Sequence, residues 1–378
     1  MKREVTFLGK LPDPFLRKDG TRVSPEEWPE YKKQLRDFVV DFEYGGMPPR
    51  PEVVKVEPLC DGNGRGTAAI WYRVTAGSRQ RQLSFLLEFM LPSPGSPGAP
   101  LREDEKYPVL LTGDGCFRNM ELDVVQAARK RGYVTARFNR LELANDVKGS
   151  REGGLYDVYP GMTFTDISAW AWGYLVCMDA LEQISFADET EVGITGHSRG
   201  GKTVLLAGAV DERIKYVCPN NSGCHGAASH RCVVTGQGDS EKQWGSKNER
   251  IRSMFQMFPT WMGPKLADYI DREQDLPYDM HYFSALIAPR YYLQNEGMQD
   301  YWINPIGAWQ NFAAVKQCYR YLGCEDHAGA WFRPGVHRHA LPDFEAFLDF
   351  MDRARNGLAL AEHLQINPYP DIELDFDW

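Results

Sequence analysis

The sequence predicts an α/β protein, a three-layer sandwich with a mostly parallel, doubly wound sheet between two layers of helices. From residue 108 onward, short apolar runs typical of strands alternate with segments of helical periodicity, which indicates parallel pairing. The chain has 378 residues, 43% of them hydrophobic and 25% charged, enough to bury a large core. We therefore expect one α/β domain over residues 1–378.

An N-terminal extension, residues 1–60, is expected ahead of the alternating region. Within it, Ser24 and Glu27 fit a capping box, which predicts a helix that runs to about Phe42. The segment 92–107 is rich in Pro, Gly and charge and is expected to be an exposed loop. Three β-rich runs precede that loop, at residues 53–57, 67–74 and 83–91.

The alternating region predicts five strands, four helices and two longer irregular segments. The expected strands lie at residues 108–112, 133–138, 192–195, 288–293 and 330–333, and the expected helices at 121–131, 166–184, 201–210 and 342–355. A long loop is expected over 139–165, and loops of that length tend to be functional. Residues 223–280 form an insertion, rich in Trp, Met and Phe, which we expect to be a helical cap over the active site.

A G-x-S-x-G pentapeptide, Gly196 to Gly200, joins the strand at 192–195 to the helix at 201–210. A serine on such a strand-turn-helix is held in a strained backbone, with its hydroxyl accessible to a histidine. The two glycines allow the strand and the helix to approach closely. We therefore predict that Ser198 is a catalytic nucleophile, against the alternative of an ordinary glycine turn with a solvated serine.

A serine nucleophile needs an acid and a base, which follow it in that order on α/β-hydrolase sheets. Asp300 lies on the loop expected after the strand at 288–293 and is our candidate acid, with Glu296 as the alternative. Asp300 could instead cap a helix or a turn. His337 follows the strand at 330–333, where the base is expected.

Two other histidines compete with His337 for the role of base. His339 lies two residues further on, and His327 precedes the last expected strand. We favour His337 because Gly335 permits a tight turn that directs the following side chains inward.

Charge and hydropathy limit the partners of the protein. The net charge of -9 argues against nucleic acid, and no apolar run is long enough to cross a bilayer. No signal-peptide core follows Met1. We expect a monomer that is cytoplasmic as written, or secreted or periplasmic if a leader has been removed.

The cysteines indicate neither disulfides nor metal. Their even number permits disulfides, but a chain of this length does not need them. No CxxC pair occurs and no His/Cys cluster has zinc spacing, so we expect reduced thiols and no structural metal. The eight cysteines are Cys60, Cys116, Cys177, Cys218, Cys224, Cys232, Cys318 and Cys324.

The segment from Gly196 to Lys202 resembles the G-[CH]-S-R-x-G-K nucleophile motif of the glucuronoyl esterases, family fifteen of the carbohydrate esterases. This motif is far more specific than G-x-S-x-G, and the resemblance covers most of the chain. Further segments that resemble the family are Leu11–Phe15 with Trp28, Tyr44–Gly45, Met47–Pro49, Ala169–Gly173, Asn221–Ala228, Phe258–Trp261, Ala285–Arg290 and Pro334–His337.

The resemblance implies a role for several residues near Ser198. Arg199 is expected to help hold the oxyanion, together with a backbone N–H near Gly200 and with the loop 113–119 as a neighbour. The alternative for Arg199 is a salt bridge beneath the loop. The resemblance also implies that Lys202, Trp302 and Glu249 bind the sugar, where the alternatives are a solvated lysine, a core tryptophan and an exposed glutamate.

One departure from the family pattern concerns the acid. Fungal members carry it in a Gln-Glu-Ser-Gly sequence, where this chain has Asn220-Asn221-Ser222-Gly223. An amide cannot stabilise an imidazolium as a carboxylate does. The acid is therefore expected on the later loop, as in many bacterial members, which favours Asp300.

The expected function is hydrolysis of a glucuronic acid ester, through an acyl-enzyme and without a cofactor. The resemblance implies a (4-O-methyl-)glucuronoyl linkage between xylan and lignin alcohols, so the partner is a small-molecule or oligosaccharide ester. The missing leader is a second departure, because that substrate lies outside the cell. The alternatives are a carbohydrate esterase for acetyl or other small esters, a degenerate homologue that only binds carbohydrate, and a peptidase.

Overall fold

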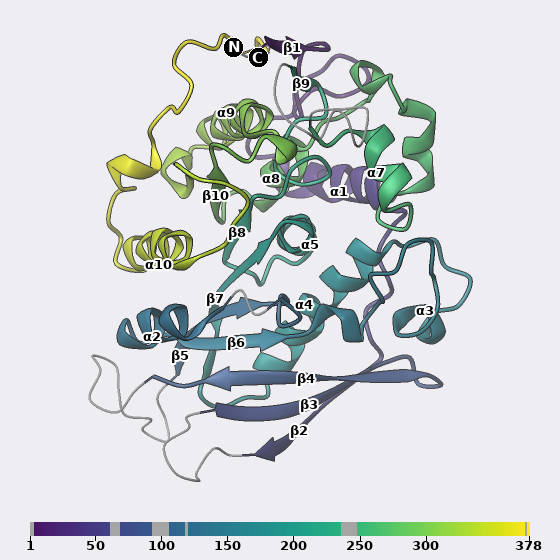
Figure 1. The fold of residues 1–378 in the computed structure, drawn as a ribbon, viewed down its shortest axis with the longest axis vertical. Coiled ribbons are helices and arrows are strands. Elements are labelled where there is room, and N and C mark those ends of the chain that lie inside the picture. Colours follow the sequence, from purple (N-terminus) through teal and green to yellow (C-terminus); the bar gives the residue numbers. More distant parts are fainter. Residues whose placement is uncertain (1–3, 61–68, 93–105, 118–119, 236–247, 375) are drawn as a thin grey trace.

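A nine-stranded sheet, in the order β11-β10-β8-β7-β5-β6-β4-β3-β2, runs through the molecule (Figure 1). A computed structural model describes residues 4–60, 69–92, 106–117, 120–235, 248–374 and 376–378. The strands are β1 Glu4–Phe7, β2 Val53–Cys60, β3 Ala69–Gly77, β4 Gln82–Met90, β5 Tyr107–Thr112, β6 Val134–Phe138, β7 Ala187–His197, β8 Tyr216–Asn220, β9 Cys232–Thr235, β10 Tyr291–Gly297 and β11 Ala328–Arg333.

The sheet is parallel from β6 to β11, whereas β2, β3 and β4 pair antiparallel at its other edge. The mostly parallel sheet expected from the sequence is confirmed. The helices are α1 Trp28–Tyr44, α2 Leu122–Lys130, α3 Leu155–Val158, α4 Asp166–Leu181, α5 Arg199–Val210, α7 Ile251–Met257, α8 His281–Ile287, α9 Pro305–Tyr321 and α10 Leu341–Arg355.

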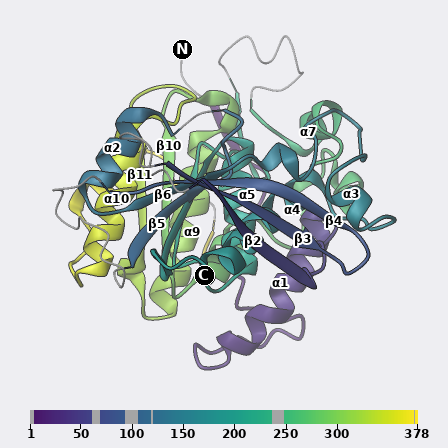
Figure 2. The same cartoon turned by 90° about the horizontal axis from the view of Figure 1, so that it is seen from below.

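Helices cover both faces of the sheet (Figure 2). Helices α2 and α10 contact each other on one face, whereas α4, α5, α8 and α9 pack successively on the other. Each face has its own apolar core, represented by Val124, Leu110 and Phe347 on the first face and by Trp170 and Leu205 on the second. The protein is thus a three-layer sandwich with the α/β-hydrolase fold.

Two elements near the predicted site differ from the expectation. Helix α5 begins at Arg199, directly after the serine, rather than at residue 201. Strand β10 continues to Gly297, so Glu296 lies inside a strand and not on a loop. The extension of β10 follows from its parallel register with β11, which pairs Glu296 with Phe332.

The N-terminal extension is shorter than expected, because residues 53–60 form the edge strand β2 of the main sheet. The predicted capping box is present: the N–H of Ser24 donates to Oε2 of Glu27 at 3.0 Å, and the N–H of Glu27 donates to Oγ of Ser24 at 3.4 Å. Strand β1 of the extension pairs antiparallel with β9 of the 223–280 insertion.

The insertion is mixed rather than purely helical, since it contributes both β9 and α7. Its residues 236–247 lie outside the described part of the chain. The same holds for 67–68 of one expected strand, for most of the expected loop 92–107 and for residues 118 and 119.

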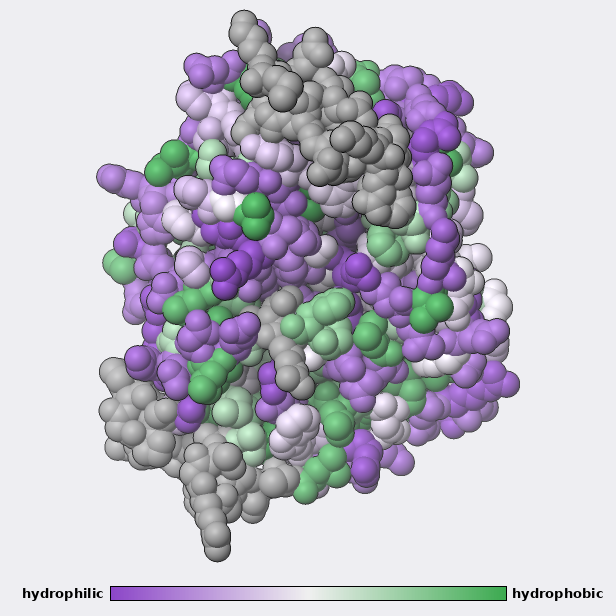
Figure 3. All heavy atoms as spheres, viewed as in Figure 1, coloured by the Kyte–Doolittle hydropathy of each residue, from purple (hydrophilic) through white to green (hydrophobic). Residues whose placement is uncertain are grey.

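The molecular surface is largely polar on the face shown in Figure 3, where hydrophobic residues form small separate groups. None of the helices within the described residues combines the length and apolar character that crossing a membrane requires.

Candidate active site

The turn between β7 and α5 holds Ser198 in a strained backbone, with φ 57° and ψ −117°. A side chain at either neighbouring glycine would prevent this turn. A Cβ on Gly196 would lie 2.5 Å from the carbonyl oxygen of Gly200, and a Cβ on Gly200 would lie 2.2 Å from the carboxylate of Asp114. The strand-turn-helix predicted from the pentapeptide is therefore present, with the serine half-buried at its apex.

A buried carboxylate supports this turn. The backbone N–H of His197 donates to Oδ2 of Asp114 at 2.6 Å, and the same carboxylate forms an ion pair with the fully buried Arg140. Burial lowers the pKa of Arg140 to about 10, so the guanidinium stays charged at neutral pH. The sequence carries no local signal for this pair, because its members follow different strands.

Asp300 and His337 meet because β10 and β11 are neighbours in the sheet. The register pairs Gly297 with Arg333, so the chain leaves both strands at the same edge. Beyond them, Nδ1 of His337 donates a hydrogen bond to Oδ2 of Asp300. Asp300 also precedes a short 3-10 turn, Tyr301–Ile303. Its side chain accepts no capping hydrogen bond there, so the alternative role of Asp300 as a cap is not supported.

Asn221 also holds the carboxylate of Asp300, through the same oxygen that His337 contacts. Its Nδ2 donates to Oδ2 of Asp300 at 2.7 Å, and its Oδ1 accepts from the N–H of Gly297 at 3.1 Å. The amide that replaces the fungal acid thus lies beside the later carboxylate. Sequence reasoning identified the replacement but not this contact.

Glu296, the alternative acid, is fully buried in β10. Neither of its carboxyl oxygens has a hydrogen-bond partner among the described residues. Burial, and then the nearby charge of Asp300, raise the pKa of Glu296 well above its usual range. It is Asp300 that is hydrogen-bonded to His337.

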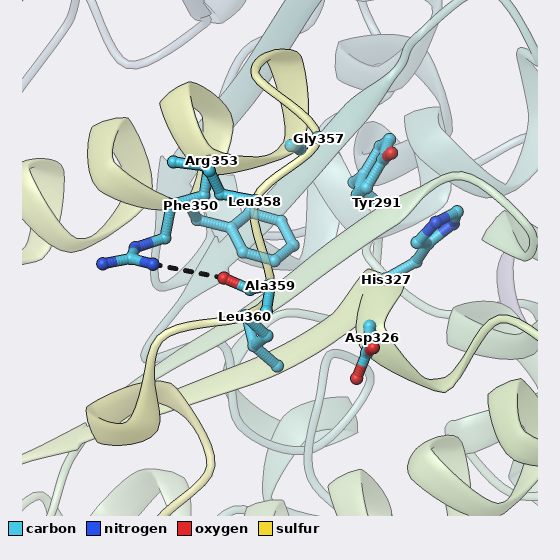
Figure 4. Close-up of a pocket in the computed structure, with 10 residues that line it drawn as sticks. Tyr291, Asp326, His327, Phe350, Arg353, Gly357, Leu358, Ala359 and Leu360 are labelled. Carbon is cyan, nitrogen blue, oxygen red and sulfur yellow. Dashed lines mark hydrogen bonds between the residues drawn. The ribbon is translucent and has the colours of Figure 1, made fainter.

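The two competing histidines, His339 and His327, make other contacts. His339 is buried and stacked on Phe344 with ring centroids 4.0 Å apart, and burial holds its pKa well below the usual range. His327 lies beside Tyr291 in a cleft of about 360 Å³ at the amino ends of β10 and β11 (Figure 4). It donates from Nδ1 to the carbonyl of Pro289 at 2.6 Å, at the opposite edge of the sheet from Ser198.

His197 connects the base to the nucleophile turn. Its ring lies 4.3 Å from the ring of His337, centroid to centroid, and its Nδ1 donates to Oδ1 of Asn220 at 2.6 Å. Burial, and then the neighbouring His337, lower the pKa of His197 to about 3, so this ring is neutral. The hydroxyl of Ser198 and the His337 ring form no hydrogen bond within the described residues, and such bonds often tighten only when substrate binds.

Arg199, the first residue of α5, forms an ion pair with Asp146. Its guanidinium also lies over the rings of Trp261, at 4.6 Å, and Phe258, at 5.2 Å. The salt bridge considered as an alternative is therefore present, through one nitrogen of the guanidinium. The cation is held next to Ser198 by contacts on two sides.

Lys202 is 1% exposed, and its ammonium group donates to the carbonyls of Ser222, at 2.6 Å, and Cys224, and to Oε2 of Glu249 at 2.7 Å. The alternatives of a solvated lysine and an exposed glutamate are wrong. The N–H of Glu249 donates to the carbonyl of Trp302 at 2.7 Å. The three residues expected to bind sugar therefore form one group, in which the half-buried Trp302 follows the acid turn.

The chain is similar in sequence to proteins of a known family. A family profile described as "Glucuronyl esterase, fungi" matches residues 74–323. The 4-O-methyl-glucuronoyl methylesterase 1 of Wolfiporia cocos is 30% identical over 354 residues, which cover 91% of this chain and 80% of that protein.

Solved structures show the same similarity. A carbohydrate esterase family 15 glucuronoyl esterase from Caldicellulosiruptor kristjansonii has a TM-score of 0.80 and 30% identity, over 97% of both chains. A serine-to-alanine mutant of the Sporotrichum thermophile glucuronoyl esterase, in complex with methyl 4-O-methyl-β-D-glucopyranuronate, shares the fold with a TM-score of 0.74 and 23% identity, over 96% of this chain and 93% of that one.

Proposed function

The chain belongs to the glucuronoyl esterases of carbohydrate esterase family 15, and on that premise we propose how its own residues hydrolyse the ester. It is a carboxylic ester hydrolase that acts on glucuronoyl esters. Because the Wolfiporia relative is named for 4-O-methyl-glucuronoyl methyl esters and the Sporotrichum complex contains one, we propose 4-O-methyl-glucuronoyl esters as the substrate class.

The observation that carries the catalytic assignment is the hydrogen bond between Asp300 and His337, on a loop that packs against the neighbour of Ser198. With Nδ1–H donated to Asp300, the lone pair of Nε2 is free to accept a proton. The carboxylate fixes this tautomer and stabilises the imidazolium that forms.

The reaction then proceeds in two displacements. Oγ of Ser198 attacks the ester carbonyl carbon while Nε2 of His337 takes its proton, and the C–O bond to the alcohol breaks as His337 returns that proton to the leaving oxygen. Water, deprotonated by His337, attacks the glucuronoyl-serine. The uronic acid leaves and Ser198 regains its proton.

The oxyanion formed at each step needs donors near Ser198. We propose the backbone N–H groups of Arg199 and Gly200, which belong to the first turn of α5 and are therefore free of intrahelical bonds. The guanidinium of Arg199 is the third donor. One such donor is worth roughly 3–4 kcal/mol of transition-state stabilisation.

We propose that Trp302 and the Lys202–Glu249 pair bind the sugar. The ring of Trp302 is half-buried beside the acid turn, so it can pack on the C–H face of the uronate. All of these groups come from one chain, and we propose a single domain that acts as a monomer.

The test compares the wild-type chain with Ser198→Ala on benzyl glucuronate and 4-nitrophenyl acetate. We expect a higher kcat/KM on the glucuronate, and loss of turnover on both substrates in the variant while uronate binding persists in calorimetry. A preference for the acetate would favour the small-ester alternative. Activity that survives in Ser198→Ala would remove Ser198 from the mechanism.

A further inference from the structure

A buried cluster of metal-ligating side chains lies on the loop after β8. Cys224, His225 and His230 are at most 3% exposed, and one ligand atom from each lies within 4.8 Å of the other two. Sγ of Cys224 is 3.2 Å from Nδ1 of His230. With ordinary zinc–sulfur and zinc–nitrogen bonds, two such ligands at tetrahedral angles lie about 3.6 Å apart. A small local adjustment would therefore suit a zinc ion.

Glu43, near the end of α1, contacts both imidazoles and is hydrogen-bonded to that of His225. Its Oε1 accepts from Nδ1 of His225, its Oε2 lies 3.4 Å from Nε2 of His230, and the hydroxyl of Tyr278 donates to Oε2. This arrangement leaves Nε2 of His225 and Nδ1 of His230 to ligate. Carboxylates behind zinc-bound histidines commonly have this position.

One ligand atom lacks a partner. Nε2 of His225 is buried and makes no hydrogen bond to any residue in the described ranges. A buried polar nitrogen without a partner destabilises the folded state. A ligand at this position would give that nitrogen its partner.

The donor set identifies the class of metal. One sulfur and two imidazole nitrogens suit zinc and not magnesium or calcium, which take oxygen ligands. A bound zinc ion would take both imidazoles in their neutral form, and its two positive charges would balance the Cys224 thiolate and the Glu43 carboxylate. A buried site with no net charge avoids the desolvation penalty of unbalanced ions.

We propose that Cys224, His225 and His230 bind a structural zinc ion, with Glu43 holding the two imidazoles. The ion clamps the loop 221–230 to α1. That loop supplies two carbonyls to Lys202 and the amide that holds Asp300, so the ion supports the active site without contacting substrate. The expectation of no structural metal missed this group because Glu43 lies far away in the sequence and the Cys-His-x4-His spacing matches no common zinc motif.

The test measures metal directly. The full chain, purified without a polyhistidine tag or chelator, is dialysed and analysed by mass spectrometry of the elements, and we expect about one zinc per chain. Cys224→Ser should lose most of that zinc. The matched control is Cys177→Ser, which alters a buried thiol in α4 outside the cluster and should retain it.

A second measurement uses the wild-type protein, so it does not require the Cys224→Ser variant to fold. Wild-type protein exchanged with Co²⁺ should show thiolate-to-cobalt charge-transfer absorption, and a chelator should lower its Tm. Wild-type protein that takes up neither ion, with a Tm indifferent to chelator, would overturn the proposal and leave a metal-free hydrogen-bonded cluster. Because metal content is measured without substrate, the result is independent of the esterase assignment.

Discussion

The two halves of the active site are held in different ways. The turn at Ser198 is closely packed, since a Cβ on either flanking glycine would meet buried atoms and Asp114 accepts a hydrogen bond from the neighbouring N–H of His197. The loop at His337 is exposed, with 39% of that side chain accessible, and is held by Asp300, His197 and the N–H of Gln299, which donates to the carbonyl of Gly335 at 2.9 Å. The nucleophile therefore lies in a strained, closely packed turn, whereas the base lies on an exposed loop positioned by contacts between strand ends.

The largest effect on turnover is expected at the hydrogen bond between Asp300 and His337. Asp300→Asn should lower kcat by roughly 10³–10⁴-fold, because the amide can favour the wrong histidine tautomer. Steady-state kinetics with circular dichroism as a folding check would measure this. A kcat close to wild type would mean that the base half does not depend on Asp300.

The half of the site that contains Ser198 is tested through the guanidinium of Arg199. Arg199→Met should lower kcat by about 10²–10³-fold with little change in KM, since the guanidinium acts on charge that develops in the transition state. The control is Asp146→Asn, which removes the ion-pair partner and leaves the guanidinium in place. Equal losses in the two variants would show that the ion pair, and not the oxyanion contact, matters.

Variants of Lys202 and Glu249 distinguish an effect on stability from an effect on substrate affinity. Lys202→Met leaves Glu249 buried without its partner, which should lower the free energy of unfolding by about 3–5 kcal/mol and raise KM. The double variant Lys202→Met/Glu249→Leu should regain stability in urea denaturation but keep the high KM. Recovery of both properties would assign these residues a purely structural role.

The smallest effect on turnover is expected at Glu296, the alternative acid. Glu296→Gln should leave kcat within a few-fold, because this carboxyl is buried and makes no hydrogen bond to His337. Its effect is on stability. Since the pKa is raised in the folded state, the wild-type chain loses stability as pH rises above the unfolded value of about 4.3.

The glutamine does not ionise, so the variant should gain stability over wild type by up to about 1.4 kcal/mol per pH unit above that value, until the folded pKa is reached. Below about pH 4 the two chains should be equally stable. Urea denaturation at pH 4, 6 and 8 measures this, with the exposed Glu373→Gln as control. A gain that is constant with pH would contradict a raised pKa at Glu296.

Several sequence predictions failed for a common reason. The strand containing Glu296 was expected to stop earlier, because Asn295, Glu296 and Gly297 have low strand propensity. In the folded chain, pairing with β11 satisfies their backbone and extends the strand. The alternative of a solvated Lys202 is wrong for the same reason, because the folded chain places two carbonyls and Glu249 around its ammonium group.

The amino-acid sequence by itself determined the strand-turn-helix around Ser198, the alternation that forms the parallel sheet, and the chain order of serine, aspartate and histidine. These features depend on propensities and spacings within a few residues. Only the tertiary structure decided which carboxylate reaches His337, how Asn221 contacts it, and that Cys224, His225 and His230 meet Glu43. Those contacts join segments far apart in the chain, and their geometry depends on which strands become neighbours and which helix covers them.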